Sequence, residues 1–216
     1  MYKKITHTIV EEHFDHPMGV NIASDVKTGR HMSRPRIAEI MSSSQFKSFV
    51  DNYFIEMEDK LVTLCNATFD DSLDFQSALA NAMDYEILGD TLGKYYDIEL
   101  QERFNQQIGN AVMQLVYYWR NSIRKFDNRE VLSRIKLQSW AMGQVVAQYN
   151  NFWDRDIVRT LFDDFFGEFI NLGNAKLAKN KANETAALDR IAANGPKLSN
   201  YIANGVLQQM PELFTA

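Results

Sequence analysis

Residues 100–123, LQERFNQQIGNAVMQLVYYWRNSI, form the most regular stretch of the chain and decide its fold. Apolar side chains recur there in steps of three and four, at Leu100, Phe104, Ile108, Ala111, Leu115, Trp119 and Ile123. Because an α-helix has about 3.6 residues per turn, these side chains share one face. The stretch therefore predicts a long amphipathic helix whose apolar face packs against other helices.

The same spacing continues on both sides of this stretch and predicts further helices. They cover about 46–64 and 75–86 before it, and 131–149, 158–170, 183–194 and 198–210 after it. The apolar face of 158–170 is too wide for a single neighbour, so this helix is expected at the centre. Gly195 and Pro196 are typical of a helix end and predict a break between the last two helices. The chain is therefore expected to be all-α, with six or seven helices in one bundle-like domain.

The first 36 residues lack such a stripe. Pro17, Gly19, Gly29 and Pro35 interrupt their short apolar stretches. We expect residues 1–36 to form an extended, largely non-helical arm in front of a helical domain at 37–216.

Composition excludes several kinds of site and indicates where in the cell the protein is expected. Cys65 is the single cysteine, which excludes a disulfide within the chain and a cysteine-rich metal site. There is no apolar run of the length that a membrane helix needs, and no signal-peptide pattern at the N-terminus. The expectation is a cytoplasmic protein without a membrane partner, or a virion protein if its source is viral.

Charge is unevenly distributed along the chain. Lys27, Arg30, Arg34 and Arg36 lie within ten residues that contain no acid, whereas acids outnumber bases by 24 to 17 after Arg36. The net charge of −5 argues against a nucleic-acid-binding function. The basic segment instead predicts an electrostatic contact with an acidic protein surface, either of a second copy or of a partner. The alternative is that this segment binds phosphate.

Histidines occur only near the N-terminus, and Glu12, His13 and His16 form the one sharp constellation. On a helix, Glu12 and His16 would share a face, and imidazole and carboxylate groups are ligands for zinc, iron or nickel. No histidine follows residue 31, which excludes the di-iron bundles that draw Glu-x-x-His pairs from two helices. A metal-dependent enzyme or sensor using this cluster stays an alternative, while the leading expectation includes no cofactor.

Other kinds of site are weakly indicated. The chain has neither a Gly-x-Ser-x-Gly elbow nor a glycine-rich phosphate loop. Trp119, Trp140 and Phe165 allow a second alternative, in which an apolar small molecule binds between helices.

Leu213 and Phe214 are apolar residues close to the C-terminal end of the sequence, which is unusual unless they dock onto something. Together with the basic segment, they are the predicted contact residues. The sequence thus favours a non-enzymatic structural or assembly protein that forms a homo-oligomer and contacts other assembly proteins. By analogy of architecture, a coat, connector or scaffold component of a viral or phage particle fits this description.

Overall fold

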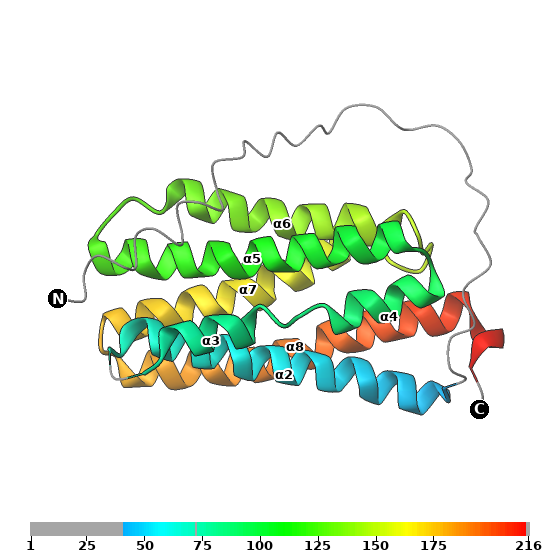
Figure 1. The fold of residues 1–216 in the computed structure, drawn as a ribbon, viewed down its shortest axis with the longest axis horizontal. Helices are drawn as coiled ribbons and strands as arrows, with labels where there is room; N and C mark the ends of the chain where they lie inside the picture. The colour runs from blue at the N-terminus through cyan, green and yellow to red at the C-terminus, as the bar shows by residue number, and fades with distance from the viewer. Residues whose placement is uncertain (1–40, 72, 215–216) are drawn as a thin grey trace. The chain divides into compact units, whose positions relative to one another are not determined.

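The structure is a computed structural model that describes residues 41–71 and 73–214. These residues confirm the all-α fold. They form α2 (Ser43–Phe69), α3 (Phe75–Ala82), α4 (Ile87–Tyr95), α5 (Ile98–Arg124), α6 (Arg129–Ala147), α7 (Arg155–Leu177), α8 (Lys181–Gln209) and the 3₁₀ turn η1 (Pro211–Leu213) (Figure 1). The predicted arm, residues 1–36, lies outside the described residues.

The helices of the described part alternate in direction and form a closed ring. α2, α5 and α7 run one way, and α3, α4, α6 and α8 run the other way (Figure 1). Around the ring, α2 packs on α8, α8 on α7, α7 on α6 and α6 on α5, while α3 and α4 connect α5 back to α2. The first and the last long helices are therefore neighbours. None of these helices is long and apolar enough to cross a membrane.

The core lies inside this ring. α7, which its wide apolar face predicts to be central, is one member of the ring and buries that face against several other helices. α7 contacts α2, α5, α6 and α8, and the rings of Phe162, Phe165, Phe166 and Phe169 are fully buried. On α5, the predicted stripe is buried from Leu100 to Trp119. Its last predicted member, Ile123, is 43% exposed, so the buried face ends one turn earlier than the spacing indicates.

The helix predicted over 75–86 is wrong in its extent, because the chain leaves the helix at Met83 and begins a second one at Ile87. Side chains of α2 stabilise this break by donating hydrogen bonds to its backbone carbonyls. The Tyr53 hydroxyl donates to the carbonyl of Tyr85 (2.9 Å), and Lys60 Nζ donates to the carbonyl of Asp84 (2.8 Å). Hydrogen bonds from a neighbouring helix thus replace those that a continuous helix would have made.

The break predicted at Gly195 and Pro196 is also wrong, since α8 continues through both residues. A proline inside a helix leaves the carbonyl four residues earlier, here that of Ala192, without its N–H partner and costs about 3 kcal/mol. Ala192 and Pro196 both face outward, where water can reach that carbonyl. On the inward face, Ile191 and Leu198 are buried on either side of the proline, and this burial outweighs the local cost.

Candidate functional site

Most of the predicted site residues lie outside the described residues. This applies to the possible metal ligands Glu12, His13 and His16 and to the basic contact residues Lys27, Arg30, Arg34 and Arg36. Both assignments therefore stay predictions. Within residues 41–71 and 73–214, no group of three or more His, Cys, Asp or Glu side chains is placed to hold a metal ion.

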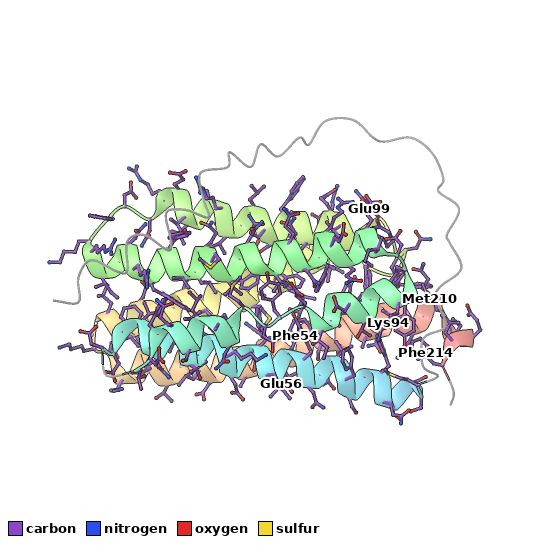
Figure 2. The ribbon with its side chains drawn as sticks, viewed as in Figure 1. Phe54, Glu56, Lys94, Glu99, Met210 and Phe214 are labelled. Atoms are coloured by element: carbon purple, nitrogen blue, oxygen red, sulfur yellow. The ribbon has the colours of Figure 1, made fainter. Side chains whose placement is uncertain are left out.

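The two predicted contact residues that are described, Leu213 and Phe214, dock onto their own chain. The ring of Phe214 stacks on Tyr95 with 5.3 Å between centroids and lies 5.1 Å from the ring of Phe46. Figure 2 places Phe214 and Met210 beside Lys94, at the end of the bundle where α4 finishes. This packing accounts for the apolar tail within one chain, and a role in contacts between chains stays a prediction.

The aromatic residues proposed for a small-molecule pocket differ in their surroundings. Trp119 is fully buried, and its indole N–H donates to the carbonyl of Phe169 (3.1 Å). Phe165 is fully buried among the rings of Phe54, Phe166 and Phe169. Trp140 on α6 is only partly buried. Trp119 and Phe165 thus serve as packed core residues.

A different feature stands out on the outward face of α2. Ile55, Glu56 and Asp59 are exposed there, and Glu56 shares a shallow groove with Asp84 and Ile87 of the α3–α4 connection. Figure 2 shows Phe54 and Glu56 on opposite sides of α2, one turned to the bundle and one turned away. We call Ile55, Glu56, Asp59, Asp84, Glu86 and Ile87 the α2 surface.

The α2 surface combines negative charge with exposed apolar side chains. Lys60 is the base beside it, and its ammonium group pairs with Asp84 (3.3 Å). Glu56, Asp59 and Glu86 form no ion pair with another described residue. Ile55 is 51% exposed and Ile87 is 59% exposed. Apolar contacts next to uncompensated charge are typical of a surface that binds a basic partner.

The sequence did not lead us to expect one of the buried residues, the acid Glu58. Glu58 lies on α2 with only 8% of its surface exposed, and its Oε1 has no hydrogen-bond partner among the described residues. Its carboxyl group contacts Gly195 of α8 closely, because a Cβ atom added to Gly195 would lie 1.9 Å from Oε1. Glu58 falls between Phe54 and Leu61 in the helical spacing of α2, and this position on the apolar stripe was a signal that it would be buried.

Burial raises the pKa of Glu58 to about 7, and the negative charge of Asp59 adds to the increase. The backbone N–H of Gly195 lowers the pKa of Glu58 and so offsets part of this increase, although Oε1 accepts no hydrogen bond from it. Such a carboxyl group changes its charge near neutral pH rather than in acid.

Comparison with known proteins identifies no relative. The chain matches no family model, no curated protein and no solved structure.

Proposed function

We propose that this protein is a non-enzymatic structural protein that assembles with copies of itself, and that its N-terminal arm is the connecting part. The observation that carries the proposal is the α2 surface, which is acidic, partly apolar and uncovered by any described helix. The basic segment Lys27–Arg36 of a second copy has the complementary charge.

The charges on the two sides support this pairing. The α2 surface contains four acids, of which Asp84 pairs with Lys60, while the basic segment carries four bases and no acid. An exposed ion pair contributes only about 0–1 kcal/mol, and salt screens it over about 8 Å at physiological ionic strength. Several pairs formed together, with burial of Ile55 and Ile87, would add enough to set the concentration at which copies associate.

The architecture extends the proposal to the type of assembly. Long helices form a rigid body, and a charged arm on a rigid body suits a coat, connector or scaffold component of a viral or phage particle. This step rests on analogy of architecture. Other assembly proteins with basic segments would then be further partners.

The test is the oligomeric state in solution, measured by light scattering and native mass spectrometry across a salt series. We expect the wild type to associate at low salt and to dissociate as salt rises. Arg30→Glu with Arg34→Glu should weaken association, and so should Glu56→Lys with Asp59→Lys. Combining the four substitutions should restore it, because the charges are then exchanged between the two sides.

Asp164→Lys with Asp189→Lys is the matched control. Both of these acids are exposed, on α7 and α8, and the change in net charge is the same as in the α2 variant. The control should associate like the wild type. A wild type that is monomeric at all salt and protein concentrations would refute self-assembly. Association that ignores both reversals would refute the arm as its connecting part.

A further inference from the structure

We propose that Glu58 is a pH-sensitive switch that controls how firmly the middle of α8 is held against α2. The geometry has three parts: a carboxyl group inside the contact between two helices, an oxygen of that group without a hydrogen-bond partner among the described residues, and a glycine directly opposite it that is followed by a proline. This inference is independent of the proposed assembly.

The first part is the position of the carboxyl group. α2 and α8 form one of the closely packed helix pairs of the ring, and Glu58 is buried between them. The contact with α8 is close, since a Cβ at Gly195 would also lie 2.8 Å from the carboxyl carbon of Glu58 and would displace the carboxyl group. The close approach therefore places this acid against the backbone of α8.

The second part is the cost of charge at this position. An ionised carboxylate that is removed from water without a full set of hydrogen bonds is strongly destabilised, whereas the neutral acid is tolerated and gains an O–H donor. The charged groups of the adjacent helices do not neutralise Glu58. Lys197 of α8 donates to the side-chain oxygen of Asn194 (3.0 Å), and Arg190 of α8 pairs with Glu168 of α7 (2.8 Å).

Three further charged groups of the adjacent helices are also engaged elsewhere or exposed. Asp51 of α2 accepts a hydrogen bond from Ser199 of α8, and Lys60 of α2 pairs with Asp84 at the α3–α4 connection. Asp164 of α7 is exposed. Asp59, next to Glu58 in the sequence, carries the same sign of charge and adds to the cost of ionisation.

The third part is the local weakness of α8. Gly195 and Pro196 are the two residue types with the lowest helix propensity, and Pro196 donates no backbone hydrogen bond. When Glu58 ionises, its carboxylate moves toward water. The backbone of α8 then opens at Gly195 and Pro196 more readily than at a turn of ordinary residues. The opening is favoured at high pH and suppressed at low pH.

The direction in pH follows from proton binding. The pKa of Glu58 is raised from 4.5 to about 7 in the folded state, so between these values the folded protein binds more protons than the unfolded chain. Folding stability then falls as pH rises through this range. The contribution of the neutral acid is fully present below about pH 4.5 and lost above about pH 7.

The experiment uses the full chain and hydrogen exchange, measured by mass spectrometry at pH 5.5 and pH 8 and corrected for the intrinsic rates. In the wild type, amides of residues 191–199 should open at least about tenfold more at pH 8, the effect of one unit of pKa shift. Glu58→Gln, which stays neutral, should abolish this difference. Asp189→Asn, which removes an exposed acid of α8 outside the α2 surface, should keep it.

Carbon NMR of the labelled wild-type glutamates gives a second readout, which does not depend on a variant that folds. The Glu58 carboxyl resonance should titrate with a midpoint near 7. A midpoint near 4.5 would overturn the proposal. So would equal opening of residues 191–199 at both pH values, or a pH dependence that persists unchanged in Glu58→Gln.

Discussion

At the scale of single residues, close contacts between a glycine and a large side chain set the distance between helices. Gly173 of α7 is the clearest case, because a Cβ atom there would lie 2.3 Å from Cδ1 of Trp119 on α5. Trp119 has no room to move away, since it is fully buried and its indole N–H is bonded to the carbonyl of Phe169. The approach of α7 to α5 thus depends on this glycine.

We therefore expect Gly173→Ala to lower the free energy of unfolding by about 1–3 kcal/mol, the usual cost of overfilling a packed core. Gly167, six residues earlier on the same helix, is the matched control because a Cβ there meets no atom within 4 Å. Gly167→Ala should leave stability unchanged or raise it by up to about 1 kcal/mol, through helix propensity alone. Urea unfolding of both variants measures the difference; equal effects would show that the contact with Trp119 is unimportant.

Contacts between a glycine on one helix and a large side chain on another cannot be predicted from the sequence. Helical spacing identifies Phe165 and Trp119 as buried, but it does not reveal which glycine faces which aromatic ring. Glu58 is an intermediate case: its place on the apolar stripe indicates burial, while its contact with Gly195 depends on residues far apart in the sequence. Leu213 and Phe214 are predicted as contact residues between chains, and that role stays a prediction; the packing of Phe214 on Phe46 and Tyr95 of its own chain is visible only in the structure.

At the scale of helices, the α3–α4 break depends on side chains that another helix supplies. Tyr53 of α2 is buried, and its hydroxyl donates to the carbonyl of Tyr85 inside the break. Removing this donor leaves a carbonyl without its partner while the ring stays in place.

Tyr53→Phe should therefore lower the free energy of unfolding by about 0.5–1.5 kcal/mol, the usual net value of one hydrogen bond. Tyr95→Phe is the control, because no hydrogen bond of the Tyr95 hydroxyl to another described residue is present. It should change stability by less than about 0.5 kcal/mol. Thermal and urea unfolding decide the point, and a loss of stability in Tyr95→Phe alone would contradict it.

Helix boundaries follow the sequence only where local preference and packing agree. They agree at the start of α2, where Ser42 and Gln45 form a capping box. They disagree at Gly195 and Pro196, where local preference ends the helix and burial of the flanking residues continues it. In the 75–86 stretch, the apolar spacing predicts one continuous helix. Hydrogen bonds from Tyr53 and Lys60 instead stabilise a break in it.

At the scale of the whole molecule, the helices of the described part form a core of their own. α7, which carries four fully buried phenylalanines, contacts α2, α5, α6 and α8, and all of these helices lie within residues 43–209. Folding of the bundle should therefore not require the first 36 residues.

Deletion of residues 1–36 should leave the helical circular dichroism and the cooperative unfolding intact, while the truncated protein elutes as a smaller species than the full chain. Far-ultraviolet circular dichroism and sizing with light scattering measure both effects. An unfolded or aggregated truncation would show that these residues belong to the core. A folded truncation with the oligomeric state of the full chain would remove the arm from the assembly.

The closure of the ring by α2 and α8 also has a consequence for the newly made chain on the ribosome. Of the described helices α2 leaves the exit tunnel first, but the helix that covers its α8-facing side ends at Gln209, about 140 residues after Phe69. At roughly 5–20 residues per second, that side waits some 7–28 seconds for its partner. Throughout this interval the nascent polypeptide exposes the α8-facing side of α2 to chaperones and to neighbouring ribosomes, and the ring closes only when α8 has been made.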